Sequence, residues 1–243
     1  MVPQCSDRST VLEDYALCFS FLSLLVNQVE SRRAVNVLEI GCGTGFLGLC
    51  VSVLTGAQVV GTEMSPVLAS IASKRIPCIQ TPSGDLPFRD RRFDLIYCKD
   101  VLPATPDHGR LIAQIREALR PGGAFVTYMP ENFDYEEKPL YRVVPGALSR
   151  SKEKYGTVGS KVEMLKSNGF GTVDRRRLHL REVPVDPGYV AKHEDGYFSN
   201  TSDPSLDVER RACLRALARG LTAVSDHGLL LFYTWERTVL IAE

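Results

Sequence analysis

The chain has 243 residues, of which 44% are hydrophobic and 24% are charged, as in an ordinary globular protein. This length suits one domain, and the hydrophobic content argues against an intrinsically disordered chain. The 29 basic and 29 acidic residues cancel, so bulk charge does not suit the chain to binding a polyanion. We therefore expect a globular protein that binds no nucleic acid.

The sequence predicts no membrane span, because it has no run of 18 apolar residues. It also predicts that the protein is not secreted. Its longest early apolar stretch, residues 16–26, follows acidic Glu13 and Asp14, whereas a signal peptide begins with basic residues. The seven cysteines form no CxxC pair, which argues against a disulfide framework or a zinc site. The expected location is the cytoplasm, with no bound metal.

Alternating strands and helices are predicted over the first half of the chain. Apolar residues recur every three or four positions over 8–30, which predicts a helix, and the apolar run 34–40 predicts a buried strand. The same reasoning predicts helices at 46–54, 65–74 and 109–119, and strands at 57–62, 78–80, 93–98 and 124–129. Strands that alternate with helices of this length predict βαβ units and a parallel sheet.

The pattern weakens after Pro130. Residues 130–158 and 182–204 are rich in turn-forming and charged residues and are expected to form loops or lids. Between and after them we expect helices at 161–168 and 206–224, and strands at 172–180 and 238–242.

A glycine-rich loop gives the strongest indication of function. In VNVLEIGCGTGFLGL, residues 35–49, the strand runs directly into Gly41, Gly43 and Gly45, and a helix follows. Glycines let the chain turn sharply and let a ligand approach without interference from Cβ atoms. The helix N-terminus beyond them offers free N–H groups. Dinucleotide-binding domains share this layout, so the loop alone leaves an NAD site open.

Three further features narrow the choice of ligand. Glu63 ends the second strand, where a carboxylate can accept hydrogen bonds from both hydroxyls of a ribose. Asp85, in Gly84-Asp85-Leu86-Pro87-Phe88, can accept from an adenine amino group. FDLIYCKDVL (93–102) and LRPGGAF (119–125) then follow in order. This ordered set resembles the class I S-adenosylmethionine-dependent methyltransferases over residues 35–128, whereas an NAD dehydrogenase gives Asp85, FDLIY and LRPGG no role.

The resemblance implies an α/β fold with a doubly wound, mostly parallel seven-stranded sheet. One strand would be antiparallel, helices would cover both faces, and lids would follow the fifth strand and precede the last. Residues 1–243 would form a single domain, divided into an N-terminal helical cap (1–33), a cofactor-binding core (34–129) and a lid with C-terminal strands (130–243). The cofactor S-adenosyl-L-methionine, which yields S-adenosyl-L-homocysteine, would lie across the carboxyl ends of the first, second and fourth strands.

The resemblance also assigns expected roles to single residues. Around the methionine and ribose portion it places Glu39, Gly41, Cys42, Gly43 and Gly45, and Glu63 would hold the ribose hydroxyls. Met64 would flank the adenine, Asp85 would meet its amino group, and Leu86 would lie at its edge. Cys98 would lie near the sulfonium. Tyr15 on the N-terminal helix would close over the cofactor, with core packing as the alternative role.

Methyl transfer by in-line SN2 displacement needs little beyond a correctly placed acceptor, because the sulfonium is already activated. A base helps only where the acceptor must lose a proton. His193, in the aromatic-rich stretch PGYVAKHEDGYF, is the candidate base, with a surface-loop histidine as the alternative. Asp100 is the other catalytic candidate, since it can contact an acceptor amine or the cofactor's edge; the alternative is a helix cap or a surface turn.

The expected substrate is a small organic acceptor, methylated on O, N or C. Tyrosines and phenylalanines gather in the segments that depart from the core pattern, and an aromatic-lined cap suits such an acceptor. A methyltransferase of lysine or another protein side chain is one alternative, although Leu102-Pro103 stands where the protein lysine methyltransferases are expected to have a tyrosine. A non-methylating scaffold or cyclisation catalyst that still binds S-adenosylmethionine is another.

Overall fold

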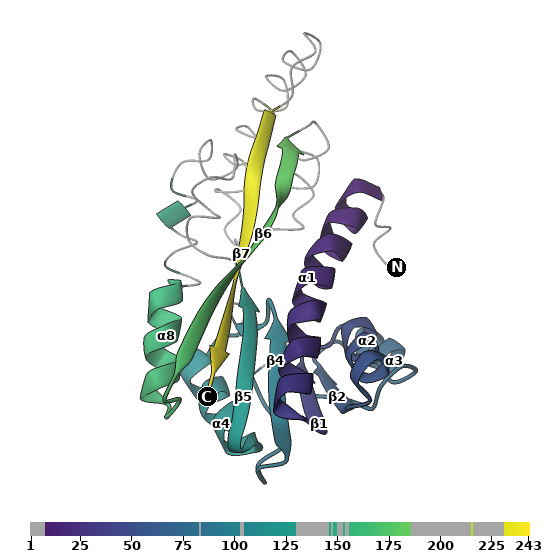
Figure 1. Cartoon of the computed structure of the whole chain (residues 1–243), viewed down its shortest axis with the longest axis vertical. Coiled ribbons are helices and arrows are strands. Elements are labelled where there is room, and N and C mark those ends of the chain that lie inside the picture. The colour runs from purple at the N-terminus through teal and green to yellow at the C-terminus, as the bar shows by residue number, and fades with distance from the viewer. Residues whose placement is uncertain are drawn as a thin grey trace. The chain divides into compact units, whose positions relative to one another are not determined.

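Seven strands form one sheet in the computed structural model of the chain (Figure 1). The structure describes residues 8–82, 84–102, 105–129, 146, 148–149, 153, 156–185, 215 and 231–243, and of 8–18, 179–185 and 231–237 the backbone only. The helices are α1 (Arg8–Arg32), α2 (Phe46–Thr55), α3 (Pro66–Ala72), α4 (His108–Ala118) and α8 (Val158–Ser167). The strands are β1 (Asn36–Ile40), β2 (Gln58–Glu63), β3 (Cys78–Gln80), β4 (Phe93–Lys99), β5 (Leu119–Met129), β6 (Val173–Val185) and β7 (Leu231–Ala242).

The sheet topology is that of a doubly wound α/β fold. The strand order is β3-β2-β1-β4-β5-β7-β6. β1 to β5 pair in parallel, and β7 runs antiparallel to β5, with Ala242 opposite Phe125. The prediction of a mostly parallel, seven-stranded sheet with an antiparallel strand is therefore confirmed. The order changes direction between β1 and β4, and ligands of such sheets bind outside the carboxyl ends of the strands at that point.

Local sequence signals set the helix ends. Ser65 caps α3 by accepting a hydrogen bond from the Leu68 N–H at 3.4 Å, and Pro66 occupies the first helical position, as predicted. Asp107 caps α4 by accepting from the Arg110 N–H at 2.9 Å. α2 ends at Gly56, whose φ of 74° places it in the left-handed region.

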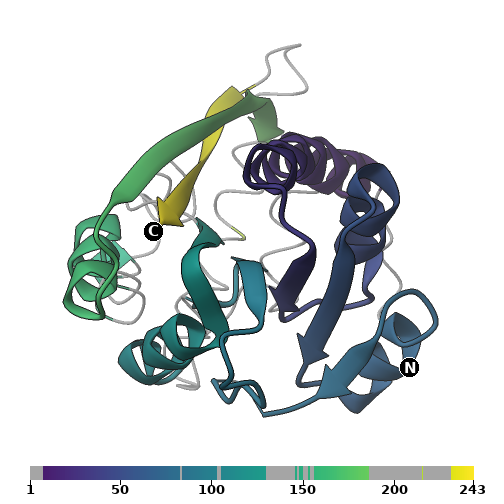
Figure 2. The same cartoon turned by 60° about the horizontal axis from the view of Figure 1, so that its bottom comes forward.

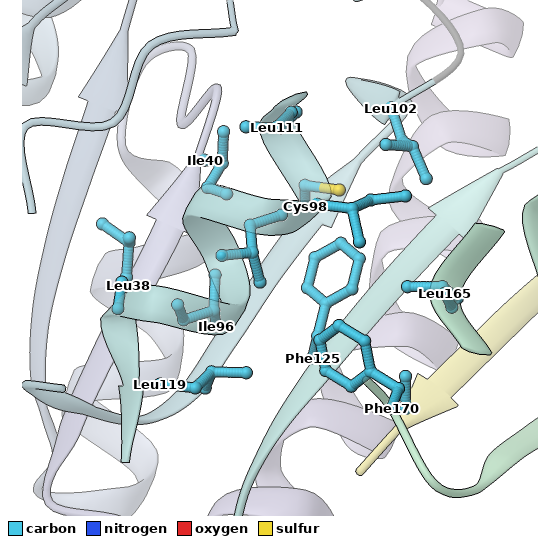
Figure 3. Close-up of a cluster of buried hydrophobic side chains, with 14 of the residues drawn as sticks. Leu38, Ile40, Ile96, Cys98, Leu102, Leu111, Leu119, Phe125, Leu165 and Phe170 are labelled. Carbon is cyan, nitrogen blue, oxygen red and sulfur yellow. The ribbon is translucent and has the colours of Figure 1, made fainter. Parts of the chain in front are cut away.

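Helices cover both faces of the sheet, and the main core lies under α4 and α8. Figure 2 shows α1 and α2 on one face and α4 and α8 on the other. Leu38, Ile40 and Cys98 project into a buried cluster that α4 and α8 complete (Figure 3). On the opposite face, Phe21 of α1 packs against Tyr128, with ring centroids 4.9 Å apart. Because side chains alternate along a strand, Glu39 lies on this second face.

β5 begins earlier than the sequence predicted. The expected helix extended to Leu119 and the expected strand began at Ala124, but α4 ends at Ala118 and Leu119 already pairs with Phe93. The next pair in register is Leu95 with Ala124, so the register shifts here and Pro121-Gly122-Gly123 lies within β5, at this irregularity of the ladder. Gly122 takes a φ of 77° there. β6 and β7 also extend beyond the apolar runs that predicted them, since strand pairing uses backbone groups that every residue carries.

The chain divides into two compact units. The first contains residues 1–129, 158–178 and 237–243, and the second contains 130–157 and 179–236. The predicted single domain with its cap, core and lid stays a prediction. Most of the loop expected at 130–158 and, except for Arg215, the whole helix expected at 206–224 lie outside the described residues. The loop expected at 182–204 begins later, because β6 runs to Val185, and its remainder is also outside them. Within the described residues, no helix is long and apolar enough to cross a membrane.

Candidate functional site

The glycine-rich loop lies at the carboxyl end of β1. Gly41, Gly43 and Gly45 have φ values of 68°, 56° and 73°, a left-handed conformation that side chains disfavour. A Cβ added to Gly41 would collide with Val101, and one added to Gly45 would stand 3.1 Å from Ala72. A Cβ added to Gly43 would meet no atom of the described residues within 4 Å. Of the three glycines, Gly43 is therefore the one whose backbone borders open space in the described part of the chain.

The Glu63 carboxylate joins the end of β2 to this loop. Its Oε2 accepts a hydrogen bond from the Gly43 N–H at 2.9 Å, and its Oε1 accepts from the Ser65 N–H at 2.9 Å. Each carboxylate oxygen has two lone pairs, so each can accept a further hydrogen bond. The next side chain, Met64, is 60% exposed although it is apolar. Gly43, Glu63 and Met64 therefore come together at one edge of the sheet.

Glu39 lies beneath α2 and is only 4% exposed. Gly48 makes room for it, because a Cβ added there would stand 2.6 Å from the Glu39 Oε2 atom. That oxygen has no hydrogen-bond partner among the described residues. Burial raises the pKa of the Glu39 carboxyl to about 8, and the negative charge of Glu63 acts in the same direction. Burial of the Glu39 carboxyl thus favours its neutral form.

Cys42 is packed against neighbouring strands. It is 7% exposed, and its Sγ lies 3.6 Å from the Sγ of Cys78 in β3. Gly61 is required beside it, because a Cβ there would stand 2.6 Å from the Cys42 Sγ. Burial raises the pKa of the Cys42 thiol, so the reactive thiolate form is disfavoured. The Cys42 backbone N–H donates to the Thr62 carbonyl at 2.9 Å, which ties the loop to β2 a second time.

The Asp85 loop is attached to α4. Asp85 Oδ1 accepts from Arg110 Nη2 at 2.5 Å, and the side chain of Asp85 is 44% exposed. Leu86 is 4% exposed, and its N–H donates to Gln114 Oε1 at 2.7 Å. Gln114 Nε2 in turn donates to the Gly84 carbonyl at 3.2 Å. Arg110 and Gln114 were not predicted from the sequence as site residues. Their spacing of four residues places them on one helix face, but nothing in the sequence says which loop that face meets.

Two expected site residues lie at the end of β4, in different surroundings. Cys98 is fully buried in the cluster of Figure 3, where its Sγ donates to Thr127 Oγ1 at 3.3 Å, and burial raises its pKa to about 11. Asp100 has a φ of 58°, an unusual value for a residue with a side chain. Its N–H donates to the Tyr128 carbonyl at 2.9 Å, and its Oδ2 accepts from Lys99 Nζ at 3.0 Å. Lys99 Nζ also lies 5.4 Å from the centre of the Tyr128 ring.

A buried polar pair connects α4 to α8. Lys161 is 3% exposed, and its Nζ lies 2.5 Å from the Nδ1 of His108 at the start of α4. Burial lowers the pKa of Lys161 to about 8.

The remaining expectations fall outside what the structure describes. The backbone of Tyr15 belongs to α1 but its side chain lies outside the described residues, and so does His193 entirely. No group of three or more His, Cys, Asp or Glu side chains that could hold a metal ion occurs in the described ranges.

The glycine-rich loop lies where the strand order changes direction, and beside it lies a carboxylate that can accept from ribose hydroxyls. This arrangement is typical of a nucleotide-binding α/β protein. The family model described as "Methyltransferase domain" matches residues 38–127. A trans-aconitate 2-methyltransferase from Deinococcus radiodurans is 29% identical over 88% of both chains. A demethylmenaquinone methyltransferase from Chlorobaculum tepidum is 30% identical over 59% of this chain and 68% of its own.

Solved structures show the same fold. The crystal structure of the YcgJ protein from Bacillus subtilis superposes with a TM-score of 0.62 at 17% identity, over 91% of this chain and 96% of that one. Together with the sequence relatives, the sheet and the glycine loop establish that the chain belongs to the class I S-adenosylmethionine-dependent methyltransferases. It is an enzyme of that family, and its cofactor is S-adenosylmethionine.

Proposed function

We propose that this chain transfers a methyl group from S-adenosylmethionine to an O, N or C atom of a small organic acceptor by in-line displacement. The observation that carries the proposal is the position of Gly43. Among the residues that the structure describes, its backbone borders open space; it is adjacent to the Glu63 carboxylate, and both lie at the carboxyl edge of the sheet. These residues fit the cofactor, because a bulky adenosyl group needs a glycine-lined approach and its ribose needs an acceptor for two hydroxyls.

Glu63 is proposed to hold the ribose hydroxyls. Both of its oxygens are fixed by backbone N–H groups and both retain a lone pair, so the carboxylate is positioned before any ligand arrives. The loop Gly41–Gly45, with Cys42 packed beneath it, would surround the methionine and ribose portion. Glu39, sealed under α2, would support that loop from below.

Asp85 is proposed to accept a hydrogen bond from the adenine amino group. Its side chain is 44% exposed, and the ion pair with Arg110 occupies only Oδ1. Met64 offers an exposed thioether side chain to one face of the ring, and such side chains adapt well to flat aromatic surfaces. Leu86 would support the edge of the ring from its buried position.

The chemical demands on the chain are modest. When bound, the cofactor supplies a methyl group that is already activated on a sulfonium. The chain therefore has to hold the acceptor atom in line and exclude water. A covalent cysteine step is not part of the proposal, since Cys98 is fully buried with a pKa of about 11. Asp100 is proposed to contact an acceptor amine or the cofactor's edge, and His193 to remove a proton where the acceptor carries one.

The first acceptor to test is trans-aconitate. The trans-aconitate 2-methyltransferase aligns over 88% of both chains, whereas the demethylmenaquinone methyltransferase aligns over 59% of this chain. A carboxylate acceptor is ionised at neutral pH and needs no general base.

The test is a transfer assay with the full chain and methyl-labelled cofactor. Trans-aconitate, a demethylmenaquinone analogue and a blank are compared, and each is repeated on Glu63→Gln. Labelled methyl ester from trans-aconitate, reduced in the variant, supports the proposal. If only the demethylmenaquinone analogue is labelled, the proposed acceptor changes from trans-aconitate to a quinone-like compound. A chain that binds cofactor but labels neither these nor a wider panel of small acids, amines and phenols would contradict the proposal.

A further inference from the structure

Two side chains on one face of α4 reach the loop that carries Asp85. Arg110 and Gln114 are four residues apart, so they project from the same side of the helix. Arg110 pairs with the Asp85 carboxylate, and Gln114 bonds the backbone on both sides of it. The proposed recognition of adenine involves Asp85 alone and assigns neither of these residues a role.

The contacts of Gln114 use both ends of its amide. Oε1 accepts from the Leu86 N–H at 2.7 Å, while Nε2 donates to the Gly84 carbonyl at 3.2 Å. The side chain is 7% exposed, so these bonds are shielded from competing water. A donor and an acceptor are both needed, which an ionised glutamate or a methionine of similar size cannot provide. Gln114 therefore clamps the peptide groups that flank Asp85.

Other contacts leave the clamped loop little freedom. The Thr81 hydroxyl donates to the Asp85 carbonyl at 3.1 Å, and the Asp85 N–H donates to the Pro82 carbonyl at 3.2 Å. Gly84 has a φ of 87°, and a Cβ there would stand 3.2 Å from Thr105 Cγ2. The Asp85 backbone is thus held while its side chain stays 44% exposed. This is the arrangement of a ligand-contacting group on a prepared support.

Arg110 limits the carboxylate in a complementary way. Its Nη2 lies 2.5 Å from Asp85 Oδ1, which fixes the orientation of the carboxylate and leaves Oδ2 to accept from another donor. Both side chains are substantially exposed, so the ion pair itself adds little stability. Its effect is on geometry.

We propose that Gln114 is a positioning residue for recognition of the cofactor's purine. By clamping the backbone on either side of Asp85, it places that carboxylate to accept from the 6-amino group, and so determines the preference for adenine over purines that lack the amino group. This inference rests on the proposed role of Asp85.

The test compares the affinities of two ligands, S-adenosylhomocysteine and its analogue whose purine lacks the 6-amino group. The ratio of their dissociation constants isolates the amino group, whereas general loss of stability weakens both alike. A hydrogen bond from a neutral donor to a carboxylate corresponds to a ratio of about 10 to 100 in the wild type. The ratio is then measured for Gln114→Leu and for Gln114→Met, neither of which can supply both the donor and the acceptor of the amide. Gln28→Met is the matched control, since Gln28 is a glutamine of α1 that is 8% exposed and bonds Arg32 instead.

The expected result is a ratio that falls to within about 3-fold of unity in both Gln114 variants and stays at the wild-type value in Gln28→Met. A wild-type ratio near unity would overturn the assignment of Asp85 to the amino group, and the inference with it. A wild-type ratio of 10 or more that both Gln114 variants retain would overturn the inference alone. Should Gln114→Met not fold, Gln114→Leu decides the outcome.

Discussion

Replacing Gly43 with alanine separates the cost of an unfavourable backbone conformation from the cost of a blocked ligand site. Gly43 has a φ of 56°, and a Cβ there meets no described atom within 4 Å. Gly56, at the end of α2, has a φ of 74° and is equally open in the described residues. The two positions are thus matched in conformation and in free space. They differ in location, because Gly43 lies at the carboxyl end of β1 and Gly56 precedes β2 at the opposite end of the strands.

The free energy of unfolding should fall by a similar amount in Gly43→Ala and Gly56→Ala. An alanine in the left-handed region costs about 1–2 kcal/mol, and no described side chain has to move in either variant. For a chain of this length, 1 kcal/mol corresponds to about 2–4 °C in melting temperature. Thermal unfolding followed by circular dichroism should therefore show two decreases that agree within a few degrees.

Binding of S-adenosylhomocysteine, measured by isothermal titration, should distinguish the two variants. A methyl group that enters a space needed by the ligand costs about 1–3 kcal/mol, so Gly43→Ala should bind roughly 5- to 150-fold more weakly. Gly56→Ala should bind like the wild type. Wild-type affinity in Gly43→Ala would refute the reasoning, because the open space at Gly43 would then not be the approach for the ligand. Equal loss in both variants would trace the effect to stability.

Three further predictions concern the dependence of stability on pH. Partial burial raises the pKa of Asp94, but hydrogen bonds from the Asn36 N–H, the Arg120 guanidinium and the Val35 N–H lower it more. The stability that Asp94 contributes is therefore present above about pH 4 and is lost in acid. Asp94→Asn should remove that part of the acid-unfolding profile. Glu39 has a pKa of about 8 in the fold, against its ordinary value of 4.5, so the free energy of unfolding should decrease as the pH rises from 4.5 to 8. In Glu39→Gln, the free energy of unfolding from urea titrations should no longer decrease over that interval. Lys161 has a pKa of about 8 in the fold, against its ordinary value of 10.5, so the free energy of unfolding should rise with pH between those values. Lys161→Met should abolish this rise. An unchanged pH profile in the variant would contradict the burial of the amine.

The sequence predicted the elements of the cofactor edge well, because local rules determine them. The glycine triplet, the Ser65 cap and the acid at the end of β2 each follow from signals within a few residues. Where a prediction missed, a pairing partner decided the result. β5 begins at Leu119 because Phe93 pairs with it, and the turn-forming residues Pro121-Gly122-Gly123 did not reveal that the strand begins before them.

The contacts that prepare the site depend on residues far apart in the chain. Gln114 meets Gly84 and Leu86 across about thirty residues, and Cys42 meets Cys78 across 36. Helix periodicity places Gln114 on the buried side of α4, but only the packing of α4 against the sheet shows which loop it contacts. The same holds for Glu39, whose burial depends on the close packing of Gly48 in α2 against its carboxyl group.

The central claim is that the carboxyl edge of β1, β2 and β4 binds S-adenosylmethionine through Glu63 and Asp85. Calorimetric titration with S-adenosylhomocysteine tests it most directly, on the wild type and on Glu63→Ala and Asp85→Ala. One site per chain is expected in the wild type, with affinities at least about 10-fold weaker in each variant, since each loses hydrogen bonds to a charged acceptor. Unchanged affinity in both folded variants would contradict it, and so would a folded wild type that shows no binding.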